Sequence, residues 1–147
     1  MIIRPATEAD LAGIVALLAD DDLGAARESP ADLAPYRRTF ELINSDPSEL
    51  LAVAERDGRL IGTLQLSVLP TLSHRGALRG QIESVRVAGS ERGRGIGEQL
   101  IKWAVEQARA RGCAMVQLTS DQRRQHAHRF YLRLGFTASH QGFKLSL

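Results

Sequence analysis

The chain has 147 residues, of which 44% are hydrophobic and 24% are charged, and its formal net charge is +2. This length and composition are typical of one globular domain with its own core, so we predict a single domain over residues 1–147. The net charge is too small to indicate a nucleic-acid partner, and no apolar run is long enough to cross a bilayer. We therefore predict no nucleic-acid partner and no membrane partner.

The N-terminus and the cysteine content bear on the compartment. Residues 1–5 lack the hydrophobic region of a signal peptide and are predicted to form a short first strand. The single cysteine, Cys113, cannot form an internal disulfide, which fits a reducing environment. We therefore expect a cytoplasmic protein in which Cys113 acts as a small buried hydrophobe.

Two helical patterns follow the first strand. Thr7 is predicted to cap a helix in which Leu11, Ile14 and Leu18 share one apolar face. A polar, turn-rich segment comes next, and a second helix is predicted over residues 31–44. The residues of this second helix expected to face inward are Leu33, Phe40 and Ile43.

An antiparallel meander is predicted over the next segment. Strands are expected over residues 50–56 and 60–69, because Asp57-Gly58 between them is a strong signal for a hairpin turn. A loop leads to a third strand over residues 79–87. Strand alternation places Gln81, Glu83 and Val85 on the same face of this strand.

The segment Arg92-Gly93-Arg94-Gly95-Ile96-Gly97 stands between this strand and a helix predicted over residues 98–111. A loop that turns directly into a helix presents backbone N–H groups with no partner in the helix, at the positive end of the helix dipole. Glycine also lets the backbone take positive φ and approach a ligand closely. We therefore interpret this segment as a binding site for a diphosphate group.

Other diphosphate-binding loops fit this segment less well. Its glycines are spaced G-x-G-x-G, whereas dinucleotide-binding folds use G-x-G-x-x-G after the first strand. No lysine is near, as a P-loop would require. A simpler alternative is a glycine-rich turn that only connects a strand to a helix.

The remaining elements complete an alternating order of helices and strands. Gly112 is placed to end the helix, and a strand over residues 114–119 is predicted to be parallel to its neighbour because a helical crossover precedes it. A further helix is predicted over residues 123–134. Residues 136–147 are expected to supply a final strand or hairpin.

Two motifs of the second half resemble signatures of the GNAT superfamily of N-acetyltransferases. Arg92, Gly95 and Gly97 form Arg-x-x-Gly-x-Gly, which resembles its coenzyme A loop. Residues 127–136 resemble its second signature, a helix carrying a tyrosine, here Tyr131, followed by Leu-Gly-Phe. The resemblance implies an α+β fold with α/β/α layers, in which helices cover both faces of a mixed, mostly antiparallel sheet that is splayed at its centre. The C-terminal part looks most like aminoalkylphosphonate N-acetyltransferases.

The resemblance also implies an activity. Acetyl-CoA would be the cosubstrate, and the primary amine of a small molecule would attack its thioester directly. The region between residues 20 and 36 would contact the acceptor, and a homodimer is an assembly found among relatives. Two alternatives stay open: a protein or peptide acceptor, and a non-catalytic acyl-CoA-binding regulatory domain on the same scaffold.

The resemblance to the family assigns cofactor binding to two neighbouring segments of the chain. The pantetheine arm of the cosubstrate would pair with the strand before the loop, as an added strand does, and a bulge is common there in the family. The diphosphate would accept hydrogen bonds from the loop. The predicted cofactor-binding residues are Val85, Arg86, Val87, Arg92, Gly93, Arg94, Gly95, Ile96, Gly97 and Glu98.

Two side chains are predicted to move protons. Tyr131, whose phenol is protonated at neutral pH, would donate a proton to the leaving thiolate; the alternative is a core tyrosine in an apolar helical stripe. Glu83 would accept a proton from the amine, directly or through water; the alternative is a carboxylate that only binds a cationic substrate. A backbone N–H near Val87 would stabilise the oxyanion.

No metal site is predicted. His126 and His128 are two residues apart on a predicted helix and point apart, and no set of ligands has the spacing of a zinc site. The resemblance to aminoalkylphosphonate N-acetyltransferases leaves a divalent-metal requirement open, because such an ion could help to bind a phosphonate.

Overall fold

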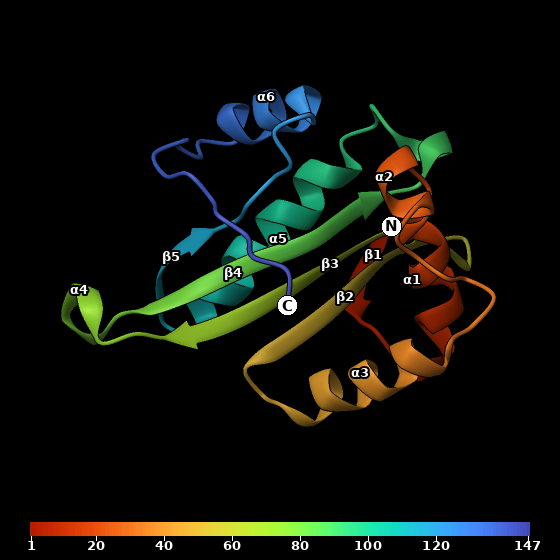
Figure 1. The fold of residues 1–147 in the computed structure, drawn as a ribbon, viewed down its shortest axis with the longest axis horizontal. Helices are drawn as coiled ribbons and strands as arrows, with labels where there is room; N and C mark the ends of the chain where they lie inside the picture. The colour runs from red at the N-terminus through yellow and green to blue at the C-terminus, as the bar shows by residue number, and fades with distance from the viewer. The chain divides into compact units, whose positions relative to one another are not determined.

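The computed structural model describes all residues 1–147 and divides into two compact units, Met1–Gln117 and Leu118–Leu147, which are described one at a time. The first unit contains a five-stranded sheet with the strand order β1 (Ile2–Pro5), β2 (Glu49–Arg56), β3 (Arg59–Pro70), β4 (Leu78–Val87) and β5 (Cys113–Gln117). Neighbours from β1 to β4 are antiparallel, and β5 is parallel to β4 (Figure 1). The prediction of a mixed, mostly antiparallel sheet is confirmed.

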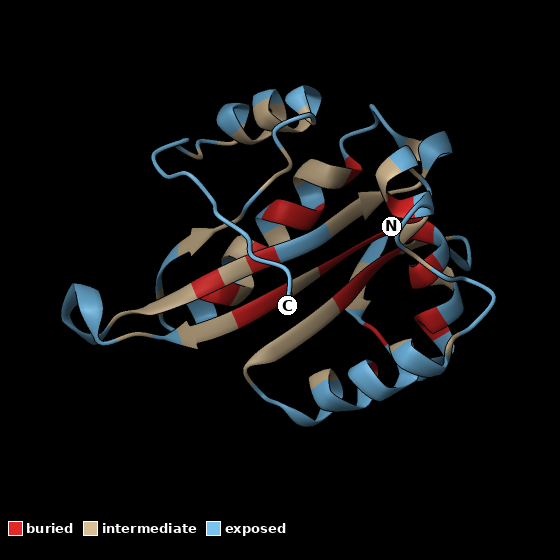
Figure 2. Ribbon diagram, in the orientation of Figure 1, coloured by how far each residue is buried: buried red, intermediate tan, exposed pale blue.

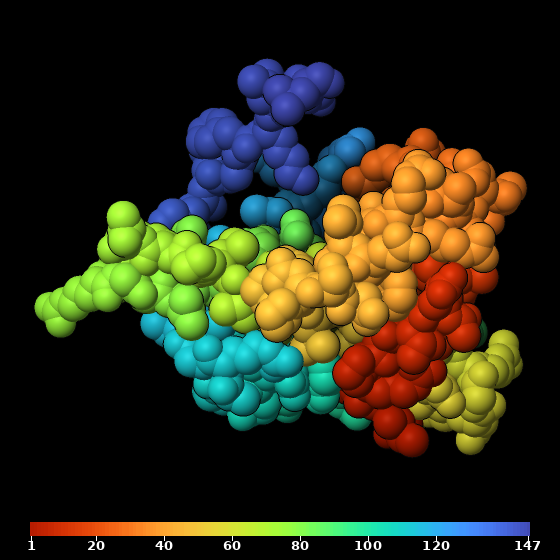
Figure 3. Space-filling model, turned by 90° about the horizontal axis from the view of Figure 1, so that it is seen from below, coloured from red at the N-terminus to blue at the C-terminus, as the bar shows by residue number.

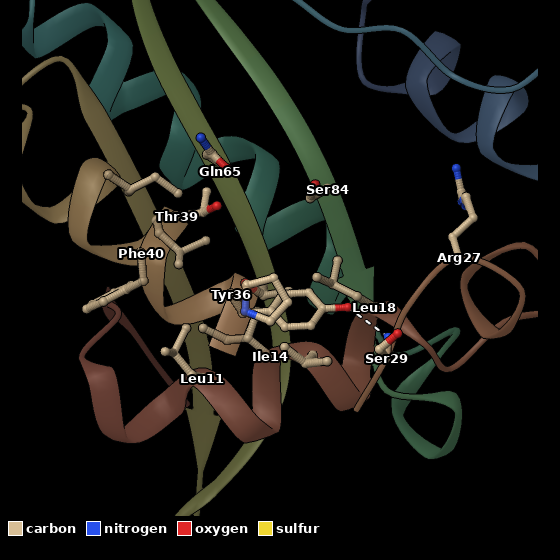
Figure 4. A pocket seen from close by; sticks show the side chains of 15 residues that line it. Leu11, Ile14, Leu18, Arg27, Ser29, Tyr36, Thr39, Phe40, Gln65 and Ser84 are labelled. Carbon is tan, nitrogen blue, oxygen red and sulfur yellow. Dashed lines mark hydrogen bonds between the residues drawn. The ribbon is translucent and has the colours of Figure 1, made fainter. Parts of the chain in front are cut away.

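Helices cover both faces of this sheet. The 3-10 turn η1 (Glu8–Asp10) leads into α1 (Leu11–Leu18), which lies with α3 (Ala34–Ser45) on one face, while α5 (Ile96–Ala110) lies on the other (Figures 1 and 4). The short helix α2 (Asp22–Ala25) follows α1. Between α1, α3 and β2 lies a core cluster of Ala6, Leu11, Ile14, Phe40 and Val53.

The packing of α5 on the sheet depends on a glycine of β3. A Cβ atom on Gly62 would lie 2.9 Å from Cδ1 of Leu100 and 3.0 Å from the carbonyl oxygen of Arg86. Such distances are too short for real side chains, so glycine allows the helix and the neighbouring strand to approach. The inner face of α5 is buried through Ile96, Leu100, Ile101, Ala104 and Ala108 (Figure 2).

A β-bulge interrupts β4 between Glu83 and Arg86, before the glycine loop. Thr63 pairs with Arg86 and Gln65 pairs with Glu83, so two residues of β4 oppose one residue of β3 between these pairs. Ser84, the first of the two, has a φ of 54°, in the left-handed region that residues with a side chain rarely adopt. The bulge re-aims the end of β4.

The sheet splays beside this bulge. β5 pairs with β4 only as far as Gln81, which lies opposite Gln117. Their side chains also meet, because Nε2 of Gln117 donates to Oε1 of Gln81 at 2.8 Å. Beyond Gln81, β4 has no strand of the first unit on this side, so the predicted central splay is confirmed.

The connection between β3 and β4 protrudes from the first unit (Figures 1 and 3). It contains α4 (Ser73–Gly76), in which His74 and Arg75 have φ values of 53° and 62°. This segment is therefore a left-handed turn rather than a regular α-helix, in agreement with the predicted loop. At the other end of β4, the turn η2 (Gly89–Glu91) leads into the glycine loop.

The second unit contains α6 (Gln125–Arg133) and a C-terminal segment without regular secondary structure. The prediction of a final strand or hairpin over residues 136–147 is wrong. Phe143, Leu145 and Leu147 alternate with polar residues as in a strand, yet all three are exposed. A strand needs a partner for its backbone hydrogen bonds, and the second unit contains no other strand.

Candidate functional site

The glycine loop presents main-chain donors at the start of α5. Gly93 and Gly95 have φ values of 76° and 77°, and a Cβ atom on either would meet nothing within 4 Å, so the loop is open on this side. The backbone N–H groups of Gly93, Arg94, Gly95, Ile96 and Gly97 donate no hydrogen bond within the chain. These donors converge with the positive end of the helix dipole, which is the arrangement that binds phosphate oxygens.

The arginine side chains of this loop are held by neighbouring groups. Arg92 donates from Nη2 to the carbonyl oxygen of Asp20 at 2.9 Å. Arg94 lies 3.7 Å from the carboxylate of Glu91, which also pairs with Arg56 at 2.9 Å. Arg92 and Arg94 remain more than half exposed and add positive potential, but the backbone supplies most of the directed donors.

The end of β4 has main-chain groups on an open edge. Ala88 donates its N–H to the carbonyl of Ile61 at 2.9 Å, and Arg86 pairs with β3, so every second residue of this stretch faces β3. The N–H of Val87 therefore points to the splayed side, where no strand of the first unit pairs with it, while its carbonyl accepts from Nε of Arg92 at 3.3 Å. Val85 lies inside the bulge, where this alternation is interrupted. Both predicted pantetheine-binding positions belong to the last part of β4, which leads into the glycine loop.

The side chain of Arg86 lies close to a carboxylate of the segment between α1 and α2. It is largely buried, with 12% of its side chain exposed, and its Nε lies 3.7 Å from the carboxylate of Asp21. Asp21 caps α2 by accepting the N–H of Gly24 at 2.6 Å, and Nη1 of Arg86 donates to the carbonyl of Val85 at 2.9 Å. Arg86 therefore ties the end of β4 to the start of α2.

Glu83 is exposed, and its carboxylate makes no hydrogen bond or ion pair in the structure. It lies opposite Gln65 in the register of β3 and β4, and residues directly opposite each other share a face of the sheet. Gln65 and the neighbouring Ser84 both line a cavity on this face. A carboxylate in this position can accept a proton from an amine or bind its cationic form, so both predicted roles of Glu83 stay open.

That cavity has a volume of about 500 Å³ and lies between α1, α3 and strands β2 to β4 (Figure 4). Much of its wall is apolar and comes from Leu11, Ile14, Leu18, Pro35, Phe40 and Ile43. Its polar lining includes Arg27, Ser29, Tyr36, Gln65 and Ser84. Three of these polar residues fall in the region between residues 20 and 36 that was predicted to contact the acceptor.

Tyr36 fixes the loop that closes one side of this cavity. Its hydroxyl accepts the N–H of Ser29 at 2.8 Å (Figure 4). It also donates to the carboxylate of Glu28 at 2.7 Å. The Ser29 N–H favours the ionised phenol, but the hydrogen bond to Glu28 and burial outweigh it and raise the pKa of Tyr36. Tyr36 therefore stays protonated at neutral pH and holds the loop after α2 against α3.

Several of these residues could not be singled out from the sequence. Ser84 acquires its position from a bulge, and a bulge depends on the register between two strands rather than on a local motif. Arg27 lies in a polar segment without periodicity. Arg56 reaches Glu91 across 35 residues of sequence, which no short motif records.

Tyr131 lies in the second unit, on α6. Its ring makes edge contacts with the rings of Phe130 and Phe136, at centroid distances of 5.2 Å and 5.8 Å. The N–H of Phe136 also donates to the carbonyl of Tyr131 at 3.1 Å. These contacts hold the ring within its unit, whereas the other predicted site residues belong to the first unit, and the acid role of Tyr131 stays a prediction.

Other candidate chemistry finds no support in the side-chain arrangement. No group of three or more His, Cys, Asp or Glu side chains is arranged to hold a metal ion. Cys113 begins β5 and is only partly buried, and desolvation raises the pKa of its thiol. None of the helices combines the length and the apolar character that a bilayer-spanning helix needs.

Comparison with known proteins places this geometry among acetyltransferases. The model of the acetyltransferase (GNAT) family matches residues 13–136. An aminoalkylphosphonate N-acetyltransferase of Salmonella typhimurium is 32% identical over 145 residues, which cover 99% of this chain and 90% of the relative. An L-methionine sulfoximine/L-methionine sulfone acetyltransferase of Pseudomonas aeruginosa is 29% identical over 143 residues, which cover 95% of this chain and 81% of the relative. A crystal structure described as a transcriptional regulator from Bacillus halodurans superposes with a TM-score of 0.95 at 45% identity, covering 99% of each chain.

Proposed function

Because the chain belongs to the GNAT family of acetyltransferases and is an N-acetyltransferase, we propose that it transfers an acetyl group from acetyl-CoA to the primary amine of a small molecule. In this proposal the amine attacks the thioester directly, without an acetylated enzyme intermediate. The names of two relatives support a small acceptor, since one acts on aminoalkylphosphonates and the other on methionine sulfoximine and methionine sulfone.

The observation that carries the proposal is the set of uncommitted backbone N–H groups at residues 93–97, next to the open edge of β4. Diphosphate oxygens accept hydrogen bonds from such groups at a helix start. Glycine at 93 and 95 keeps the approach clear, because a side chain there would stand in the open space beside the donors. The amides of the pantetheine arm would pair with the main chain of Val85 and Val87.

The chemistry requires one bond to form, one to break and two protons to move. The amine nitrogen bonds to the thioester carbon, and the C–S bond then breaks. Glu83 takes the proton that the ammonium loses, directly or through water, and the N–H of Val87 donates to the developing oxyanion. Tyr131 gives a proton to the leaving thiolate, whose basicity is close to that of a cysteine thiolate. The nitrogen loses its second proton as the amide forms, and this proton returns to the Tyr131 phenolate, directly or through water, so that the products are the amide, the CoA thiol and one proton on Glu83.

A second candidate function is supported by one relative. The Bacillus halodurans protein at 45% identity is described as a transcriptional regulator, so the second candidate is a regulatory role of the same scaffold, which we infer would bind acyl-CoA without turnover. The two functions differ in one measurable respect. An acetyltransferase releases free thiol when a suitable amine is added, and a regulatory domain binds the thioester without releasing it.

The test combines calorimetry with a thiol-release assay. Purified protein is titrated with CoA, and acetyl-CoA is then incubated with aminoalkylphosphonates, amino acids, polyamines and a peptide panel. We expect binding of CoA and release of thiol with at least one small amine. Binding without release for any amine favours the regulatory domain, release only with peptides favours a peptide acceptor, and no heat with CoA refutes both acyl-CoA-based functions.

A glycine variant links the binding to the loop. Gly95→Ala places a Cβ on a residue at φ 77°, which strains the backbone of the loop. We expect CoA binding to weaken about tenfold or more, because the loop changes conformation and its N–H groups no longer point toward the diphosphate. Gly112→Ala is the matched control, since Gly112 also has positive φ, at 81°, and open space around it, but lies at the other end of α5. Equal CoA affinity in the two variants would contradict the role of the loop.

A further inference from the structure

The cavity between α1, α3 and β4 is a candidate acceptor pocket, and its volume of about 500 Å³ lies within the usual range for small-ligand sites. Its apolar wall is formed by side chains from both helices (Figure 4). Such a wall binds hydrocarbon, since apolar surface removed from water is the main source of affinity there. A small, purely polar amine would leave this wall uncovered.

Three of the polar side chains that line the pocket already make hydrogen bonds within the protein. The hydroxyl of Thr63 donates to the carbonyl of Ala52 at 2.8 Å, and Nε2 of Gln65 donates to Glu49 at 2.8 Å. The hydroxyl of Tyr36 accepts from the N–H of Ser29 and donates to the carboxylate of Glu28. These groups shape the pocket, but they have little capacity left to recognise a ligand.

Arg27 is the only charged side chain that lines the pocket, and no carboxylate lines it. Its Nε donates to the carbonyl of Leu23 at 2.9 Å, which orients the guanidinium and leaves both terminal nitrogens without a protein partner. A guanidinium presents two parallel N–H donors to a carboxylate or a phosphonate. Figure 4 shows Arg27 on the loop after α2, across the pocket from Gln65, with its guanidinium end pointing away from Tyr36 and Leu18, and Arg27 is exposed.

The pocket therefore has one anion-binding end, an apolar middle and, beside Ser84 on β4, the exposed carboxylate of Glu83. We propose that the acceptor is a small amine that carries an apolar side chain and one oxyanion group, as hydrophobic amino acids and their aminophosphonate counterparts do. This inference rests on the proposed acetyltransferase function. The amine lies toward β4, the apolar side chain lies against α1 and α3, and Arg27 binds the oxyanion.

The same charge arrangement disfavours polycationic acceptors. A polyamine or an aminoglycoside would bring additional ammonium groups to a pocket that is lined by an arginine and by no carboxylate. Removing such charges from water without a counter-ion is costly, and the arginine adds repulsion. These amines therefore serve as negative controls.

The experiment measures thiol release from acetyl-CoA with matched acceptors. Phenylalanine and its aminophosphonate counterpart carry both the apolar group and the oxyanion, phenethylamine lacks the oxyanion, and glycine lacks the apolar group. We expect both complete acceptors, or at least one of them, to exceed phenethylamine, glycine and spermidine in kcat/KM by about tenfold or more. The preferred member of the pair shows whether the oxyanion is a carboxylate or a phosphonate.

A charge-removing variant locates the oxyanion. In Arg27→Gln we expect KM for the preferred acidic acceptor to rise about tenfold with kcat little changed, and the parameters for phenethylamine to stay the same. Arg38→Gln is the matched control, because Arg38 is exposed on α3 and does not line the pocket. It should leave all acceptors unaffected.

Two outcomes overturn the inference and leave the acetyltransferase standing: phenethylamine or spermidine as the better acceptor, or an Arg27→Gln variant that loses acidic and neutral acceptors equally. Absence of CoA binding in calorimetry is a different failure and overturns the proposed function itself. Release with none of the acceptors, despite CoA binding, overturns both the inference and the enzymatic proposal.

Discussion

The carboxylate of Asp10 offers a direct test of how the start of α1 is held. Asp10 is buried and accepts hydrogen bonds from both terminal nitrogens of Arg4, at 2.8 Å and 2.9 Å, and from the N–H of Thr7 at 2.7 Å. The hydrogen bond from Arg4 lowers the pKa of Asp10 from 3.8 to about 2; burial opposes this effect and Thr7 reinforces it. Arg4 also binds Glu55 on β2, so this ion-pair network joins the first strand to its neighbour.

The size of the effect follows from the two pKa values. Because the pKa is lower in the folded state, the ionised carboxylate stabilises the fold at pH values above 3.8, and this contribution disappears as the pH falls through about 2. The gap between the two pKa values corresponds to roughly 2 kcal/mol at neutral pH. About half of that contribution is expected to remain at pH 3.

Asp10→Asn should therefore lower the free energy of unfolding by roughly 2 kcal/mol at pH 7, measured by urea denaturation and circular dichroism. The difference from the unmodified protein should shrink as the pH is lowered from 5 to 3. Asp57→Asn is the matched control, because Asp57 is exposed at a turn and makes no ion pair. Equal stability of Asp10→Asn and the unmodified protein at pH 7, or a loss that does not change with pH, would refute the reasoning.

The remaining predictions concern the proposed reaction. Tyr131→Phe removes the phenolic proton and should lower kcat about a hundredfold without changing the calorimetric affinity for CoA; unchanged turnover would show that Tyr131 is a packing residue. Glu83→Gln should lower kcat by a similar factor at neutral pH if Glu83 takes the proton. A rise in KM at constant kcat would instead assign Glu83 to binding the ammonium form of the acceptor.

Much of the fold could be predicted because its signals are local. The Asp57-Gly58 turn joins β2 and β3 as expected, and Asp57 and Gly58 both have positive φ. The helix predicted over residues 98–111 is also present as α5, which begins two residues earlier than predicted, at Ile96. Helix ends were less accurate: α3 begins at Ala34 rather than at residue 31, since the N–H of Ala34 donates to the side chain of Asp32 in a turn before the helix.

What could not be predicted depends on contacts between distant segments. The C-terminal residues have the alternation of a strand, but alternation alone supplies no partner for backbone hydrogen bonds. The bulge at Ser84 results from the pairing of β3 with β4, and the contents of the pocket result from the packing of α1 and α3 against the sheet. Motifs identify the glycine loop because its donors are neighbours in the chain, whereas the pocket draws its lining from five separate elements.

The main-chain character of the glycine loop has a consequence for how this protein can diversify. An N–H group is common to every residue except proline, so most substitutions outside the glycines leave those donors in place. The pocket, by contrast, owes its character to side chains between Leu11 and Ser84, many of them on two helices and the loop after α2. Engineering or natural drift can therefore exchange the side chains that line the pocket, and with them its ligand preference, while the main-chain donors of the glycine loop stay in place.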